Sequence, residues 1–399
     1  MIKYNLKTGV LTLLILIAGC STKKETLNWY RGNLHTHSYW SDGDDFPEMI
    51  MDWYKSNGYH FIGLSDHNIL AEGEKWKTIQ GKEILLRGFE RYLEKFGKDW
   101  VEYKQDSAGI TARLKTLSEY QPLFQEEGRF LIIPSEEITD KLEGKTVHVN
   151  ATNIQKVIMP QGGKTIAEML QNNINAVIRQ REETGVPILP HINHPNHHYS
   201  ITAEDLIQVQ GERFFEVYNG HHRVNNLGDS VHISTEEMWD VVNMAYLEKN
   251  QPLLYGVATD DCHNYHEFGK DRSNPGRGWI MVNTNSLTAE SLIGAMEEGK
   301  FYASSGVTLD YIHYDKNQIR LKVTATPGVN YDIQLIGWRE GDDKTSVLAH
   351  TNDTEVKFNL DETIRFARVK VLSDKLKANP NWEGEFETAW TQPVTIIKR

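Results

Sequence analysis

Six short apolar segments of this chain end in histidine or acidic residues, and this pattern constrains the fold more than any other feature. In α/β barrels, side chains that follow the carboxyl ends of parallel strands gather at one mouth. Residues distant in the sequence can therefore meet there. The residues concerned are His35, His37 and Asp42; Asp66 and His67; Glu136 and Glu137; His148; His191 and His194; and Asp260, Asp261 and His263.

Strand-like runs alternate with amphipathic stretches, a pattern typical of α/β architecture with a mostly parallel sheet. The stretch 70–128 is longer than a crossover requires, and we interpret it as a helical insertion that covers one end of a barrel. Residues 306–399 contain closely spaced alternating strands, which predict a small β-sandwich and a domain boundary near residue 305. The expected helices are 46–57, 80–96, 111–126, 164–184, 234–249 and 288–299.

The alternation of side chains along a strand groups some of these residues. Residues i and i+2 of an extended segment point to the same face. His35 and His37 can therefore share one cation. Asp261 and His263 repeat this arrangement, and Asp260 should point away from them.

The same rule leaves other assignments open. Glu136 and Glu137 face opposite sides, and periodicity alone does not say which one enters the site. We expect Asp66 to support His67 by a hydrogen bond rather than to bind metal. Cys262 is expected to be a packing residue.

The chemistry of the side chains favours a metal site. Imidazole and carboxylate are ligands that suit Zn, Mn and Fe, whereas closed structural zinc sites commonly use thiolates. The chain has only two cysteines, Cys20 and Cys262, so a thiolate cluster is not available. Five further histidines either line a pocket or lie on the surface: His191, His197, His198, His221 and His222.

These motifs resemble the polymerase-and-histidinol-phosphatase (PHP) superfamily of metal-dependent hydrolases over roughly residues 30–305. The motifs are H-x-H followed by S-D-G, then D-H, an x-Glu element, a histidine, H-P-N and D-x-H. The segments "INHPN", "DDCHNY" and "GKFYASSGV" are more similar to the CehA/McbA-like branch. The resemblance implies a distorted (β/α)7 barrel that holds two or three divalent ions.

The resemblance also implies which residues would hold each ion. One position takes His35, His37, Glu137 and Asp261; a second takes Asp42, His67 and His263; a third takes Glu137, His148 and His194, with Glu137 bridging. Ser135 departs from the family, which usually has glycine before its x-Glu, and this departure bears on the choice between Glu136 and Glu137.

The resulting hypothesis is a metal-dependent hydrolase, with a phosphoester as the favoured substrate. Metals about 3.5–4 Å apart can clamp a bridging water and lower its pKa towards about 7, so a bridging hydroxide would be the nucleophile. His194 or a nearby pocket histidine would protonate the leaving group, and Asp261 is a further catalytic candidate. Arg223 either meets an anionic substrate or is an ordinary solvated arginine.

Two alternatives remain open at this point. The same metals could hydrolyse a carbamate, ester or amide, and an apolar mouth in place of convergent Arg or Lys would favour that reading. The chain could instead be a lipoprotein that binds a surface glycan or a protein through its β-rich tail, with a degenerate metal site.

The N-terminus resembles the signal peptide of a bacterial lipoprotein. Lys3 and Lys7 precede the apolar run "GVLTLLILIAGC", which is too short to span a bilayer. Cleavage of residues 1–19 would leave a lipidated Cys20 followed by a linker, 20–29. We therefore expect an exported protein anchored to a membrane and facing the periplasm or the cell surface.

The charge of the chain bears on its partners. Its formal net charge is -12, and loss of the signal peptide would make it about -14. Such a charge disfavours sequence-independent binding to nucleic acid. The expected partners are a small phosphorylated molecule and, through Cys20, a membrane.

Overall fold

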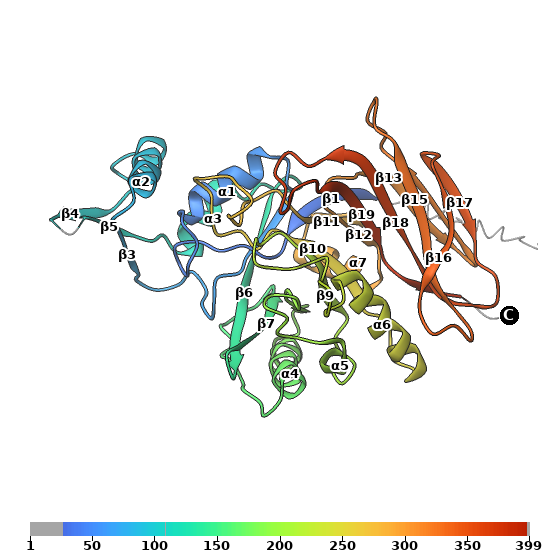
Figure 1. Ribbon diagram of the computed structural model, residues 1–399. Helices are drawn as coiled ribbons and strands as arrows, with labels where there is room; N and C mark the ends of the chain where they lie inside the picture. Colours follow the sequence, from blue (N-terminus) through green and yellow to red (C-terminus); the bar gives the residue numbers. More distant parts are fainter. Residues whose placement is uncertain (1–26, 108, 397–399) are drawn as a thin grey trace, which may run out of the picture.

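A mixed sheet of 14 strands forms the frame of the protein, seen in a computed structural model that describes residues 27–107 and 109–396 (Figure 1). The predicted signal peptide and Cys20 lie outside these residues. None of the helices within them combines the length and the apolar character that crossing a bilayer requires. The first nine strands of this sheet are β1 (Asn28–Asn33), β2 (Phe61–Leu64), β6 (Leu131–Leu142), β7 (Lys145–Thr152), β8 (Leu189–Ile192), β9 (Phe214–Asn219), β10 (Tyr255–Thr259), β11 (Trp279–Thr284) and β12 (Phe301–Ser304).

The strands pair in the order β10-β9-β8-β7-β6-β2-β1-β11-β12. The pairs β1–β2, β2–β6, β8–β9 and β9–β10 are parallel. Strand β7 is antiparallel to both of its neighbours. The reason is local: Leu142 pairs with Lys145, and the two residues between them, Glu143 and Gly144, have positive φ angles of 49° and 90°. A two-residue loop of this kind reverses the chain into a hairpin.

The predicted (β/α)7 barrel is not confirmed, because the sheet is not closed. Strand β10 forms a ladder only with β9 among the described strands. Beyond their ends, the segments after β1 and β10 approach each other through one parallel bridge between Thr36 and Cys262, where the His37 N–H donates to the Cys262 carbonyl at 2.9 Å. The sheet therefore curls enough to bring its strand ends together without completing a barrel.

The insertion contains strands as well as helices. Its elements are β3 (Trp76–Ile79), α2 (Glu83–Phe96), β4 (Tyr103–Asp106), β5 (Gly109–Arg113) and α3 (Leu117–Phe124). The three strands form their own sheet in the order β3-β5-β4. The helix expected over 111–126 is wrong in its first part, because residues 109–113 pair with strands on both sides. Helix α3 starts only after Thr116, which forms a capping box with Glu119.

The β-rich tail continues the large sheet. Strand β12 pairs with β19, and the order continues through β18 and β15 to β16. A second sheet, β13-β14-β17, shares an apolar core with these strands. The two layers form one end of the molecule (Figure 1). The domain boundary near residue 305 stays a prediction. The strands are β13 (Leu309–Asp315), β14 (Gln318–Val323), β15 (Tyr331–Arg339), β16 (Ser346–Thr351), β17 (Glu355–Asn359), β18 (Ile364–Leu376), β19 (Phe386–Thr391) and β20 (Val394–Thr395).

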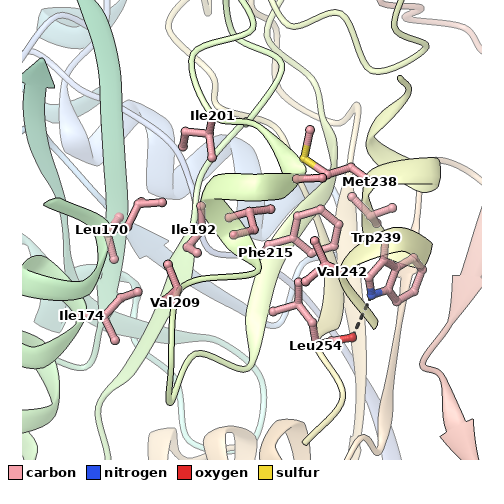
Figure 2. Close-up of a cluster of buried hydrophobic side chains, with 14 of the residues drawn as sticks. Leu170, Ile174, Ile192, Ile201, Val209, Phe215, Met238, Trp239, Val242 and Leu254 are labelled. Atoms are coloured by element: carbon pink, nitrogen blue, oxygen red, sulfur yellow. Dashed lines mark hydrogen bonds between the residues drawn. The ribbon is translucent and has the colours of Figure 1, made fainter. Parts of the chain in front are cut away.

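Helices pack on the sheet through apolar faces. The helices outside the insertion are α1 (Pro47–Ser56), α4 (Ile166–Thr184), α5 (Ala203–Leu206), α6 (Thr235–Glu248) and α7 (Ala289–Glu297). Figure 2 shows Leu170 of α4 and Trp239 of α6 directed at Phe215 of β9. The indole of Trp239 also donates to the Leu254 carbonyl at 2.8 Å. Burial of these side chains fixes β8 and β9, the strands whose ends carry part of the site.

Substitutions on α6 test this packing. Val242 is fully buried, whereas its neighbour Val241 is 40% exposed. Val242→Ala removes two buried methyl groups, and we expect it to lower the free energy of unfolding by about 2 kcal/mol. Val241→Ala is the matched control and should change it by less than about 0.5 kcal/mol. Chemical denaturation of both variants makes the comparison, and equal effects would contradict this packing.

A buried acid before β9 predicts a pH effect on stability. Glu212 is 1% exposed, and its Oε1 accepts the N–H groups of Arg213 and Phe214, while its Oε2 has no hydrogen-bond partner. Burial raises the pKa of Glu212 to about 8. Folding therefore binds a proton that the unfolded chain releases above about pH 4.5, and the stability gained from this proton is lost as the pH rises towards 8.

Glu212→Gln removes this titrating group, so we expect its free energy of unfolding to depend less on pH than that of the wild type. Between pH 5 and pH 8 this variant should gain stability relative to the wild type, by up to about 1.4 kcal/mol for each unit of the pKa difference. Glu94→Gln, at an exposed position of α2, should show no such trend. Chemical denaturation at several pH values measures the free energy of unfolding of each protein. If that free energy changes with pH in the same way for the wild type and Glu212→Gln, the raised pKa of Glu212 is refuted.

Candidate metal centre

The ends of four strands, together with the middle of β6 and β7, bring all nine predicted ligand residues into one cluster. Two of them follow β1 directly, one follows β2, one follows β8 and two follow β10, as expected for strand ends that share an edge. The loop after β1 supplies Asp42. The members are His35, His37, Asp42, His67, Glu137, His148, His194, Asp261 and His263.

Glu137 lies at the centre of this cluster. Its carboxylate is buried, and five imidazoles surround it. One oxygen, Oε1, faces three of these rings, and Oε2 faces the other two. The nitrogen-to-oxygen distances are 3.3 Å for His35, 2.8 Å for His148 and 3.2 Å for His194 to Oε1, and 3.4 Å for His37 and 2.8 Å for His67 to Oε2.

Two aspartates complete the cluster. Asp261 places Oδ1 3.3 Å from Nε2 of both His35 and His37. Asp42 places Oδ1 3.2 Å from Nε2 of His263 and 3.4 Å from Nε2 of His67. The Asp261 side chain is 6% exposed and that of Asp42 is 57% exposed. The cluster thus extends from the buried Asp261 to the exposed Asp42, and this exposed edge is the mouth of the cluster.

The structure decides between the two adjacent glutamates. Glu136 points to the other face of β6, where its Oε1 accepts the N–H of Ile158 at 2.6 Å. Burial raises the pKa of Glu136 to about 8, so it is a neutral acid at pH 7. Glu137 alone of the pair contacts the histidines.

The donor atoms fit divalent cations. The buried atoms His35 Nε2, His37 Nε2 and Glu137 Oε2 have no hydrogen-bond partner, although they converge. A buried polar atom without a partner is costly, and a shared cation would satisfy all three. Sets of ligand atoms that lie within 4.8 Å of one another are His35, His37 and Glu137; His37, Asp42, His67 and His263; His67, Glu137 and His148; His35, His194 and Asp261; and His35, His191 and Glu216.

These sets agree in part with the predicted ligand groups. The first holds three of the four residues expected there and lacks Asp261, and the second holds the expected residues with His37 added. The third differs, because His148 and Glu137 group with His67, whereas His194 groups with His35 and Asp261. The number and identity of the ions stay predictions.

The cluster is strongly polarised. Burial opposes a charge on Glu137, but the imidazoles of His148, His35 and His67 lower its pKa well below the usual range. Burial likewise opposes the charge of Asp261, and His35 and other imidazoles lower its pKa well below the usual range. Metal binding requires ionised carboxylates and neutral imidazoles, so a divalent ion would take the place of the protons that these carboxylates favour on the imidazoles.

A further buried carboxylate, Glu216 in the middle of β9, was not predicted from the sequence. Its oxygens accept hydrogen bonds from Nδ1 of His35 at 2.7 Å, from the backbone N–H of His194 at 2.7 Å and from the Thr259 hydroxyl at 2.7 Å. The bond to Nδ1 leaves Nε2 of His35 free to face the cluster. An acidic residue inside the apolar run "RFFEVYN" was the available signal.

Other sequence expectations have mixed outcomes. Asp260 faces away as predicted and accepts N–H groups of Arg277 and Gly278. Asp66 does not support His67; it accepts hydrogen bonds from the Ser38 backbone and hydroxyl at 2.8 and 2.7 Å, and so holds the loop after β1. Nδ1 of His67 instead lies 2.5 Å from the Thr139 hydroxyl.

The remaining histidines lie around the cluster. His191 is fully buried beside Glu216, with Nε2 3.5 Å from Oε1. The ring centroids of His197 and His194 are 5.1 Å apart, and those of His221 and His263 are 5.2 Å apart. His198 and His222 pack on His197 and His221, respectively. Cys262 is buried, in agreement with a packing role.

Arg223 lies at the rim rather than inside the cluster. Its side chain is exposed, and its backbone N–H donates to Nδ1 of His221 at 3.1 Å. Burial and then the positive charge of Arg223 lower the pKa of His222. The structure therefore places this guanidinium near the histidine-rich rim.

Comparison with solved structures finds distant similarities. A two-domain protein containing a predicted PHP-like metal-dependent phosphoesterase, from Bacteroides vulgatus, is 14% identical with a TM-score of 0.40 over 93% of this chain and 95% of its own. A protein from Bifidobacterium adolescentis, provisionally described as a metal-dependent phosphoesterase, is 13% identical with a TM-score of 0.30 over 67% and 94%. An amidohydrolase from Chromobacterium violaceum, with bound sulfate and no metal, is 12% identical with a TM-score of 0.28 over 61% and 89%.

At these values the similarities establish neither a family nor an activity for this chain. No protein-family model and no curated protein matches its sequence. Membership of the PHP superfamily stays a prediction from the motifs.

The two adjacent glutamates provide a test of the site. Glu137→Gln removes the charge at the centre of the cluster, and we expect the metal content of the full-length protein, purified in detergent, to fall by at least about ten-fold at limiting metal. Glu136→Gln replaces a neutral acid on the opposite face and should retain the metal of the wild type. Elemental analysis after dialysis compares them; equal metal content in the two variants would contradict a ligand role for Glu137.

Proposed function

We propose that this protein is a metal-dependent hydrolase and that its substrate is a phosphoester. The observation that carries the proposal is the buried cluster in which unpartnered nitrogens of His35 and His37 converge on the carboxylates of Glu137 and Asp261. The cluster also reaches its exposed edge at Asp42, whose side chain is 57% exposed.

The ligand residues would hold two or three divalent ions of Zn, Mn or Fe. Such ions polarise a substrate oxygen and lower the pKa of water. Glu137 would bridge neighbouring ions; the support is that its two oxygens face different sets of imidazoles. Glu216 would keep His35 in one orientation throughout the reaction.

His194 is the candidate proton donor for the leaving group. Burial disfavours its charge, but the hydrogen bond to Glu137 and the field of Asp261 raise its pKa above the ordinary value, which favours the protonated form that a proton donor needs. Its neighbour His197 differs, because burial and the charge of His194 lower its pKa to about 3. A neutral His197 cannot donate a proton but can accept a hydrogen bond from the substrate.

The rim favours an anionic substrate over a neutral acyl compound. Arg223 and several histidines border the cluster, and cationic or donor groups there would stabilise the charge that phosphoester hydrolysis spreads over several oxygens. An apolar mouth would instead favour the carbamate, ester or amide hypothesis. The complete ligand set also argues against a degenerate site in a purely binding protein.

The N-terminal sequence supports a location for this activity. We propose that Cys20 carries lipid and holds the enzyme at a membrane, facing the periplasm or the cell surface. The support is the order of Lys3 and Lys7, the apolar run and the cysteine.

An activity panel tests the proposed reaction. Full-length protein in detergent, loaded with Mn or Zn, should hydrolyse p-nitrophenyl phosphate or a diester analogue, and chelation should abolish the activity. His194→Gln should lower kcat by about 10²–10⁴-fold if it donates the proton. Turnover of p-nitrophenyl acetate or a carbamate alone would replace the phosphoester with an acyl substrate. Metal-loaded protein that hydrolyses neither class would refute the proposal.

A further inference from the structure

The inserted sheet presents a lysine to the interior of the protein. Side chains of a strand alternate between its two faces, so Lys77 and Ile79 of β3 share one face, and Trp76 and Thr78 share the other. Ile79 is 1% exposed and belongs to an apolar core, whereas Thr78 is exposed. Lys77 therefore points inward, towards the body of the protein.

The inward face of β3 lies on the loop that carries a metal-site residue. The ammonium of Lys75 donates to the Trp40 carbonyl, and the ammonium of Lys77 lies 5.1 Å from the centre of the Tyr39 ring. This loop continues to Asp42, the aspartate at the mouth of the cluster. Two lysines of the insertion, Lys75 and Lys77, thus approach the mouth, and Lys75 donates a hydrogen bond to the loop.

The second lysine has spare hydrogen-bonding capacity. Lys77 is half-buried, and within the described part of the chain its ammonium makes no hydrogen bond and no ion pair. Burial and the charge of Lys75 lower the pKa of Lys77, while the carboxylates of Asp42 and Asp66 oppose that change. A partly desolvated ammonium in this position gains from an anion that brings oxygen acceptors.

We propose that Lys77 binds the anionic group of the substrate and so makes the insertion a specificity element for phosphoesters. The inference rests on the proposed function and names the group that would distinguish a phosphate from a neutral acyl substrate. Lys77 would approach the mouth from the side of Asp42, and Arg223 from the side of His221 and His222. An ammonium donates to phosphate as a point charge with three N–H groups.

The test compares Lys77→Ala with Lys104→Ala in the full-length, Mn-loaded protein. Lys104 belongs to the same inserted sheet, but it is exposed and its ammonium lies 4.7 Å from the Trp76 ring on the outer face. The two variants lose the same charge, so only position differs. Lys77→Arg tests rescue by another cation, and melting temperatures confirm that each variant is folded.

Three measurements are made on each protein: KM and kcat for p-nitrophenyl phosphate, kcat/KM for p-nitrophenyl acetate, and the Kd of inorganic phosphate by calorimetry. Lys77→Ala should raise KM and the phosphate Kd about ten-fold, as expected for a lost charged hydrogen bond. Its kcat and its activity on the acetate should stay within about two-fold, and Lys77→Arg should recover part of the phosphate affinity. Lys104→Ala should match the wild type.

The outcomes separate the two proposals. An unchanged phosphate Kd in Lys77→Ala, or an equal change in Lys104→Ala, would overturn the role of Lys77 even if phosphoester turnover is normal. Weaker phosphate binding in Lys77→Ala, together with a wild type that hydrolyses no phosphoester, would support anion recognition and refute the proposed reaction. Wild-type protein that does not bind phosphate would overturn the role of Lys77.

Discussion

The contact between the Glu137 carboxylate and five imidazoles organises the site. These rings come from segments after β1, β2 and β8 and from β7, and each lies within 3.4 Å of the carboxylate. A buried carboxylate is stable only when it is paired and hydrogen-bonded. The fold must therefore hold all of these segments in register, and a divalent ion would relieve the remaining unpartnered nitrogens.

A layer of buried polar groups behind the ligands supplies rigidity. Glu216 accepts hydrogen bonds from His35, from the backbone after β8 and from Thr259 on β10. Asn193 donates to Glu137 at 2.7 Å and to Asn150 at 2.8 Å. These bonds connect neighbouring strands through side chains. Because these groups are buried and hydrogen-bonded to one another, they hold the candidate ligands in fixed orientations.

Different parts of the chain position the candidate ligands, stabilise the strands and approach the mouth. The curled half of the large sheet positions the ligands, and α4 and α6 stabilise β8 and β9 from behind (Figure 2). The insertion projects from the body in Figure 1, yet its inner face packs on the loop that carries Asp42. An element added to the frame in this way can change substrate preference while the metal ligands stay fixed.

The sequence by itself determined which side chains are candidate metal ligands and how neighbours within a strand are oriented. Local alternation and residue type were enough to identify the strand ends that carry histidines and acids. They were also enough to place His35 and His37, at i and i+2, on one face. The six apolar segments that carry the candidate ligands form β1, β2, β6, β7, β8 and β10, and the expected helices are present apart from the first part of 111–126. These features depend on contacts between neighbours in the sequence.

Only the tertiary structure decided the rest. The choice of Glu137 over Glu136, the hidden support from Glu216 and the approach of Lys77 all depend on which segment lies opposite each face. The hairpin at Glu143 and Gly144 set the antiparallel direction of β7, and the sheet curled without closing. The alternation of side chains shows that the two faces of a strand differ. Which segment packs on each face is fixed by pairing between distant segments, and the residue pattern does not encode that pairing.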